Sequence, residues 1–178
     1  MDFTITPAER SDIPEITEIY GHHVRHGTAS FETEPPSIQD MADRLGRVLS
    51  AGSPWLVARG SDGRVLGYAY SSQFRDRAAY RFAAEDSIYI RDDMRGKGIG
   101  AALLTALVEA SEAAGFRQLF AVIGGAEPAS IALHAGAGFH MAGRMVGIGR
   151  KHGRWLDTVY MQRALGPGDS TPPDEVPT

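Results

Sequence analysis

The chain has 178 residues, a mass of 19.2 kDa, 43% hydrophobic residues and a formal net charge of −4. These values are typical of one soluble globular domain and exclude a global positive field for duplex nucleic acid or an anionic membrane. The absence of cysteine excludes a disulfide framework, a cysteine nucleophile and thiolate metal sites. No segment reaches the roughly 18 apolar residues of a membrane span, and the N-terminus lacks a signal-peptide pattern, so we expect a cytoplasmic protein.

The first half of the chain predicts a short strand, two helices and a hairpin. After a strand over 3–6, apolar residues recur at helical spacing over 12–24, and again behind the capping residue Ser37 until Gly52. The turn signal Asp62-Gly63 between two β-branched and aromatic runs indicates an antiparallel hairpin.

The second half predicts a strand, a glycine-rich loop and a helix, followed by further strands. The expected elements are strands over 87–91, 118–123, 141–148 and 155–161, and helices over 101–114 and 128–137. This order favours an α/β (α+β) domain over 1–165, with a mixed, mostly antiparallel sheet and helices on both faces. Residues 166–178 hold 4 of the 10 prolines and are expected to form a flexible tail.

The segment between the predicted strand at 87–91 and the following helix carries the chemistry. Gly96, Gly98 and Gly100 alternate there, so backbone N–H groups can approach a ligand at a helix N-terminus, and Arg95 and Lys97 add positive charge. These features favour phosphate binding. A glycine-rich turn that serves packing alone is the alternative.

Two phosphate-binding motifs do not fit this loop. A Walker loop needs Ser or Thr after Gly-Lys, whereas Gly98 follows Lys97. A dinucleotide fingerprint belongs to an N-terminal βαβ unit with an acidic residue about 20 positions on, and Phe116 stands there instead.

The sequence RGKGIG at 95–100 resembles the pyrophosphate loop of the GCN5-related N-acetyltransferases, the GNAT superfamily. Further segments are similar to the phosphinothricin and methionine sulfoximine acetyltransferases of that superfamily. They are TASFETEP at 28–35, WLVA at 55–58, FRDRAAYRFAAE at 74–85, AVIG at 121–124, HAGAGF at 134–139 and KHGRWLD at 151–157. The resemblance therefore covers nearly the whole chain before the tail and implies a GNAT fold.

The resemblance also implies roles for individual residues. Glu85 would be the general base for the acceptor amine; an ordinary exposed glutamate is the alternative. His134 would be the acid for the departing thiolate, although it can instead bind the acceptor or cap a helix.

For acetyl-CoA, the resemblance implies that the backbone of Ile88, Tyr89 and Ile90 pairs with the pantetheine arm, and that an N–H, that of Ile90, supports the oxyanion. The pyrophosphate would lie on the loop formed by Arg95, Gly96, Lys97, Gly98, Ile99, Gly100 and Ala101. Glu127 stands where the family usually has an asparagine that binds pantetheine, which weakens the expectation for coenzyme affinity.

The acceptor pocket implied by the resemblance contains Phe31, Arg75, Arg77 and Tyr80. A guanidinium pair suits a carboxylate together with a phosphinate, sulfoximine or sulfone group, whereas a solvated arginine-rich loop is the simpler interpretation.

Together these residues predict direct acetyl transfer from acetyl-CoA to the α-amino group of a small amino acid analogue. The family likeness implies a homodimer, and no metal is assigned because the five histidines other than His134 show no metal-ligand spacing tied to a carboxylate. Two alternatives stay open. One is a relative that acetylates protein N-termini, polyamines or aminoglycosides, and the other is a non-catalytic coenzyme A sensor.

Overall fold

The structure, a computed structural model, describes residues 2–173. Its strands are β1 (Phe3–Pro7), β2 (Trp55–Gly60), β3 (Val65–Gln73), β4 (Ala83–Ile90), β5 (Gln118–Gly124), β6 (His140–Lys151) and β7 (Arg154–Ala164). Its helices are α1 (Ile13–His26), α2 (Ile38–Ser50), α3 (Ile99–Ala113) and α4 (Pro128–Gly136), with short 3₁₀ turns at Arg10–Asp12, Ala78–Tyr80 and Asp92–Met94.

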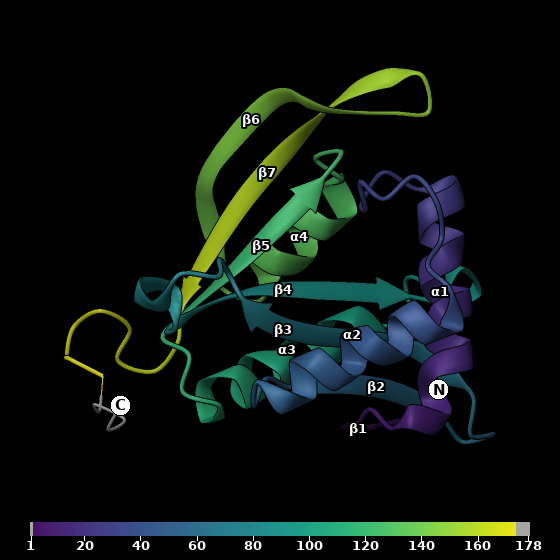
Figure 1. Cartoon of the computed structure of the whole chain (residues 1–178), viewed down its shortest axis with the longest axis horizontal. Coiled ribbons are helices and arrows are strands. Elements are labelled where there is room, and N and C mark those ends of the chain that lie inside the picture. Colours follow the sequence, from purple (N-terminus) through teal and green to yellow (C-terminus); the bar gives the residue numbers. More distant parts are fainter. Residues whose placement is uncertain (1, 174–178) are drawn as a thin grey trace.

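The strands form one seven-stranded sheet in the order β1-β2-β3-β4-β5-β7-β6. All neighbours are antiparallel except β4 and β5, so the expected mixed, mostly antiparallel sheet is confirmed. Figure 1 shows β2, β3 and β4 crossing the lower half of the molecule while β5, β7 and β6 rise away from them.

Helices cover both faces of the sheet. Apolar residues of α1 and α2 pack with Trp55, Val57 and Tyr68 on one face. On the other face, Ile99, Leu103 and Leu107 of α3 pack against Leu66 and Ala69 of the sheet. A third cluster joins α3 and the loop residues Phe116 and Phe139 to β5 and β7, and α4 residues border it.

Strand β4 begins at Ala83 rather than at the predicted Ser87. The earlier residues have weak strand propensity, but both neighbouring strands pair with them: Glu85 lies opposite Ser72 of β3 and Phe120 of β5. Long-range pairing therefore places Glu85 inside a strand instead of before it.

Strands β4 and β5 separate at the middle of the sheet. Their parallel pairing joins 83–86 to 118–121 and includes no residue after Asp86. Residues 87–90 keep their pairing with β3 on the other side. One side of the second half of β4 is therefore open to a ligand.

Helix boundaries follow local signals. Ser37 caps α2, with its hydroxyl accepting a hydrogen bond from the Asp40 amide at 3.1 Å. Gly98 is the N-cap of α3 with φ +80°, a left-handed conformation that favours glycine. The chain therefore turns sharply from the glycine loop into α3.

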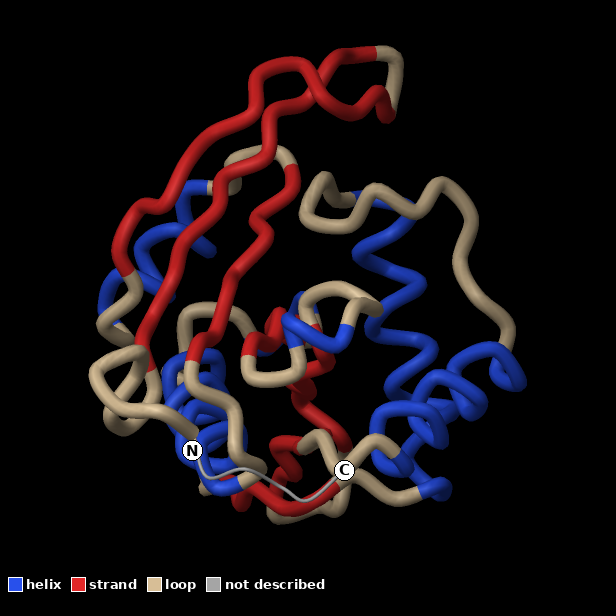
Figure 2. The backbone as a smooth tube through the Cα atoms, turned by 60° about the vertical axis from the view of Figure 1, so that its left-hand side comes forward, coloured by secondary structure: helices blue, strands red, loops and turns tan. Residues whose placement is uncertain are grey.

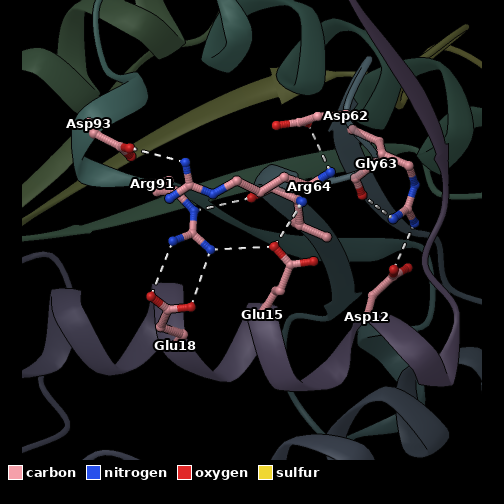
Figure 3. Close-up of polar contacts among 10 residues, drawn as sticks. Asp12, Glu15, Glu18, Asp62, Gly63, Arg64, Arg91 and Asp93 are labelled. Carbon is pink, nitrogen blue, oxygen red and sulfur yellow. Dashed lines mark hydrogen bonds and ion pairs between the residues drawn. The ribbon is translucent and has the colours of Figure 1, made fainter.

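An ion-pair network fixes α1 against the end of β4, as Figure 3 shows. The Arg91 guanidinium lies 3.1 Å from Glu18 Oε1 and 3.5 Å from Glu15 Oε2, both on α1. Its Nε donates to the carbonyl of Val65 at 3.2 Å, and the Val65 amide donates to Glu15 at 3.1 Å. The start of the glycine loop is thus tied to both α1 and β3.

The segment between α1 and α2 is held to the distant hairpin of β6 and β7. In Figure 2 this tan segment reaches from α1 toward the red strands before returning to α2. Buried Lys151 donates to the Ser30 carbonyl at 2.7 Å, and His152 Nε2 lies 3.2 Å from the Gly27 carbonyl. The KHGRWLD segment therefore positions the chain around Phe31.

The predicted tail lies partly outside the described residues, which end at 173. Arg117 donates to the carbonyls of Gly168 and Pro172, at 3.4 and 3.2 Å. Among the helices that the structure describes, none has the length and apolar character to cross a membrane.

Candidate active site

A cavity of about 490 Å³ opens where β4 and β5 separate, and we call it the Glu85 cavity. Its walls come from α1, the α1–α2 segment, α2, the middle strands and α4. The polar side chains that line it are Tyr20, Ser30, Glu32, Arg44, Tyr70, Glu85, Asp86, Ser87, Tyr89, Ser130, His134 and Thr158, and Phe31 adds an aromatic ring.

Glu85 points toward the α1 and α2 side of β4 and carries a perturbed carboxyl group. Burial raises the pKa of Glu85 to about 7, the Asp86 charge adds to this rise, and Arg75 opposes it. The nearest guanidinium atom of Arg75 lies 3.9 Å from Glu85 Oε2. A carboxyl group with a pKa near neutrality suits a general base.

Asp86 and His134 form a buried pair on the opposite side of β4. The side chains are only 2% and 3% exposed, and Asp86 Oδ2 lies 2.9 Å from His134 Nε2. The other ring nitrogen, Nδ1, donates to the Ser130 carbonyl at 2.7 Å. Burial by itself would lower the pKa of His134, but the hydrogen bond and charge of Asp86 outweigh burial and raise it.

A second cavity, of about 760 Å³, extends from β4 to the glycine-rich loop, and we call it the loop cavity. Ile88 and Tyr89 line both cavities, so the two are adjacent. Its other lining residues include Ile90, Arg95, Gly96, Gly98, Ile99, Gly100, Ala101 and Glu127. The loop residues predicted to bind a pyrophosphate therefore lie together, except for Lys97.

The backbone of β4 alternates in the direction it faces. The Phe74 amide donates to the Ala83 carbonyl and the Arg91 amide to the Leu66 carbonyl, both at 2.9 Å, so odd-numbered residues of β4 bond β3. Ile88 and Ile90 consequently turn their backbone groups toward the open side. Tyr89 turns its backbone to β3, which differs from the expectation that all three residues pair with pantetheine.

The loop cavity fits the elongated, anionic coenzyme. A Cβ atom added at Gly96 or Gly98 would meet no atom within 4 Å, so the backbone there is approachable, and both glycines have positive φ angles. The backbone groups of Ile88 and the N–H of Ile90 supply partners for an amide-containing arm. Glu127 instead accepts a hydrogen bond from Thr28, which commits its carboxylate to the α1–α2 segment.

Four predicted residues lie outside the lining of both cavities. Lys97 donates to the Asp93 carbonyl at 2.9 Å, and exposed Tyr80 packs edge-on against Phe74 with ring centroids 5.9 Å apart. Arg77 is exposed in the same segment, and Arg75 reaches Glu85 only from outside the cavity.

The Glu85 cavity contains a cation that the sequence analysis missed. Arg44 of α2 lies 5.3 Å from the centre of the Tyr20 ring and 2.9 Å from Glu32 Oε1. Its helical position marked it only as part of a polar helix face. No sequence motif connects it with Glu85, because folding alone brings α2 beside β4.

An open strand backbone, a glycine-rich helix start and an inner carboxylate together define a coenzyme A-dependent acyltransferase. Residues 5–160 match the family model described as "Acetyltransferase (GNAT) domain". The chain belongs to this family, so it is an acetyl-CoA dependent N-acetyltransferase, and the expected GNAT fold and co-substrate are confirmed.

The chain is also similar to proteins with narrower names. It is 49% identical to a phosphinothricin N-acetyltransferase of Alcaligenes faecalis, over 96% of this chain and 87% of that protein. It is 39% identical to an L-methionine sulfoximine/L-methionine sulfone acetyltransferase of Pseudomonas aeruginosa, over 97% of this chain and 100% of that protein. A crystal structure of a phosphinothricin acetyltransferase from Sinorhizobium meliloti in complex with AcCoA has a TM-score of 0.96 and 52% identity, covering 98% of this chain and 95% of that chain.

Proposed function

We propose that this enzyme transfers the acetyl group of acetyl-CoA to the α-amino group of a small acidic amino acid analogue of the phosphinothricin, methionine sulfoximine or methionine sulfone type. The observation that carries the proposal is Glu85, whose carboxyl group has a pKa of about 7 at the opening between β4 and β5. The named relatives support the acceptor class.

In the proposed reaction the acceptor amine occupies the Glu85 cavity. Glu85 accepts the amine proton, directly or through water, and a backbone N–H on the open side of β4, that of Ile90, donates to the oxygen that becomes negative. The amine attacks the thioester carbon, the carbon–sulfur bond breaks, and the thiolate receives a proton from the His134 imidazolium, which becomes neutral. No covalent enzyme intermediate is required.

One cation that lines the Glu85 cavity, Arg44, supports an acidic acceptor. Arg44 is the one guanidinium among the residues that line it in the described part of the chain. Its terminal nitrogens can bind a carboxylate or a phosphinate-type oxygen once they exchange their contact with Glu32. We assign Arg44 as the acceptor's anion partner, whereas Arg75, Arg77 and Tyr80 would act from the rim.

Release of thiol from acetyl-CoA tests the function. The acceptors are phosphinothricin, methionine sulfoximine, methionine sulfone and ordinary amino acids, with spermidine and an aminoglycoside as members of the alternative class. We expect preference for the first three. Coenzyme binding without thiol release for any acceptor would support a sensor, and preference for a polyamine would overturn the acceptor class.

A homodimer is part of this proposal. The edge strand β6 exposes Met141, Met145, Val146 and Ile148, with Val146 81% exposed, and Trp155 of β7 is 67% exposed. An apolar edge strand is a hazard for a monomer and a suitable surface for a second copy. Light scattering should give twice the chain mass, and Val146→Glu should give a monomer. A monomeric unmodified protein would contradict the proposal.

A cytoplasmic location also stays a prediction. Fractionation of host cells, with an antibody against the chain, tests it.

A further inference from the structure

His23 lies at a junction between two parts of the loop cavity. It belongs to α1 and is buried, yet both of its ring nitrogens have polar partners from later in the chain. Nε2 lies 2.8 Å from the carbonyl oxygen of Ile90, and Nδ1 lies 3.4 Å from a terminal nitrogen of Arg95. Ile90 ends the open half of β4, and Arg95 begins the glycine-rich loop.

The two partners determine the protonation state of the ring. A carbonyl oxygen can only accept a hydrogen bond, so Nε2 carries a proton. A guanidinium can only donate, so Nδ1 must be an unprotonated acceptor. Only the neutral Nε2–H tautomer satisfies both contacts.

We propose that neutral His23 is a positioning residue for acetyl-CoA, which fixes the end of β4 and the Arg95 guanidinium relative to each other. Its ring connects the strand that faces the pantetheine arm to the loop that faces the pyrophosphate. The proposal depends on coenzyme binding and is independent of the acceptor and of the role of Glu85.

Protonation of His23 would break this arrangement. A second ring proton on Nδ1 would face the Arg95 donor, and a positive ring would repel the guanidinium. The other groups near the ring are His22 on α1, Asp92 after β4 and the Tyr89 ring of β4, whose centroid is 5.3 Å away. Burial, followed by the Arg95 and His22 charges, outweighs the Ile90 hydrogen bond and the Asp92 charge and lowers the pKa of His23. The neutral form therefore prevails at physiological pH. Acid should break the contact between His23 and Arg95 and leave the guanidinium with its ion pair to Asp92, 3.4 Å away.

Two variants separate the contacts. His23→Gln places an amide donor near the Nε2 position but no acceptor near Arg95, whereas His23→Asn places an acceptor near the Nδ1 position but cannot reach Ile90. Neither side chain titrates. The exposed His140 of β6 provides the matched control, as His140→Gln.

The experiment is calorimetric titration of the full-length protein with coenzyme A between pH 5.5 and 8. The terminal phosphate of the coenzyme titrates near pH 6, but it does so equally in every variant. We expect wild type and His140→Gln to lose about 10-fold more affinity than His23→Asn or His23→Gln as the pH falls. At pH 8, His23→Gln should bind more weakly than His23→Asn. Equal pH dependence in all four proteins would overturn the proposal.

A second measurement uses the unmodified protein, so its result does not depend on whether the variants fold. Binding and protonation are linked, so saturation with coenzyme A should lower the pKa of His23 in a ¹⁵N NMR titration. A bound polyanion acting only by its charge would raise that pKa instead. An upward or absent shift would therefore contradict the positioning role, while leaving the proposed acceptor class untouched.

Discussion

Asp86 Oδ2 and His134 Nε2 lie 2.9 Å apart in a buried pair, while His134 Nδ1 donates to the Ser130 carbonyl. The Asp86 carboxylate and the Ser130 carbonyl both accept hydrogen bonds, so an imidazolium ring, with a proton on each nitrogen, satisfies both. The other carboxylate oxygen, Asp86 Oδ1, is buried without a hydrogen-bond partner among the described residues. The two contacts and the raised pKa of His134 both favour the imidazolium form beside the Glu85 cavity, with the Asp86 carboxylate as its counter-charge.

Replacing Asp86 by Asn should make His134 titrate at a lower pH, because the neutral amide no longer stabilises the imidazolium. NMR of the ring measures this shift. A raised histidine pKa contributes stability that is present below the unfolded value of about 6.5 and is lost as the pH rises through the folded value. The stability deficit of Asp86→Asn should therefore shrink from pH 6 to pH 9. A constant deficit, or an unchanged titration, would contradict the charged pair.

Replacing Glu85 by Gln should remove the rise of kcat with pH that centres on the pKa of about 7. A base acts only when deprotonated, so wild type should gain activity up to about pH 8, and the variant should be slower by about 10²-fold or more and nearly flat. Coenzyme affinity should stay the same. Glu109→Gln, on the exposed face of α3, is the matched control. A variant with the wild-type pH profile would exclude Glu85 as the base.

Replacing Arg44 by Met should raise the KM of the acceptor by about 10-fold and leave the KM of acetyl-CoA unchanged, because Arg44 lines only the Glu85 cavity. Arg47→Met, on an exposed turn of the same helix, is the control. Steady-state kinetics with both substrates varied give the two constants. An effect on the coenzyme alone would refute the assignment of Arg44.

Gly98→Ala should weaken coenzyme A binding, whereas a glycine substitution with the same cost in unfolding free energy elsewhere should not. Gly98 and Gly63 have φ angles of +80° and +84°, and neither has an atom within 4 Å of an added Cβ. Each alanine should therefore cost about 1 kcal/mol of unfolding free energy. Only Gly98 lies in the loop cavity. Equal coenzyme affinity of Gly98→Ala and Gly63→Ala would argue against a phosphate-binding loop.

Local sequence patterns predicted the fold correctly where neighbouring residues determine the structure, as at helix ends and turns. The Ser37 cap, the stop at Gly52 and the hairpin around Asp62-Gly63 all occur as expected. The start of β4 differs because its first residues become a strand by pairing with both neighbours. The spacing of apolar residues along the chain does not indicate this pairing between distant strands.

The residues of the candidate site also fall into two groups, those with a signal in the sequence and those that only the fold brings to the site. Gly96 and Gly98 carry a motif, whereas Glu85 was identified through the resemblance of residues 74–85 to the acetyltransferase family. Arg44 and His23 could not, because no motif marks either residue. His23 reaches its partners Ile90 and Arg95 across more than 60 residues, and Arg44 comes beside Glu85 only when α2 packs near β4. The charged and aromatic cluster of Arg75, Arg77 and Tyr80 was predicted to form part of the acceptor pocket. None of these residues lines the Glu85 cavity.

The short β4–β5 pairing has a mechanical consequence. Only the parallel register of 83–86 with 118–121 joins β1–β4 to β5–β7 in the sheet of the described chain. A coenzyme arm that occupies the opening would contact both β4 and β5. Coenzyme binding should therefore reduce the motion of β5–β7 relative to β1–β4. Amide hydrogen exchange of β5, far from the glycine-rich loop, should then slow when coenzyme A is added.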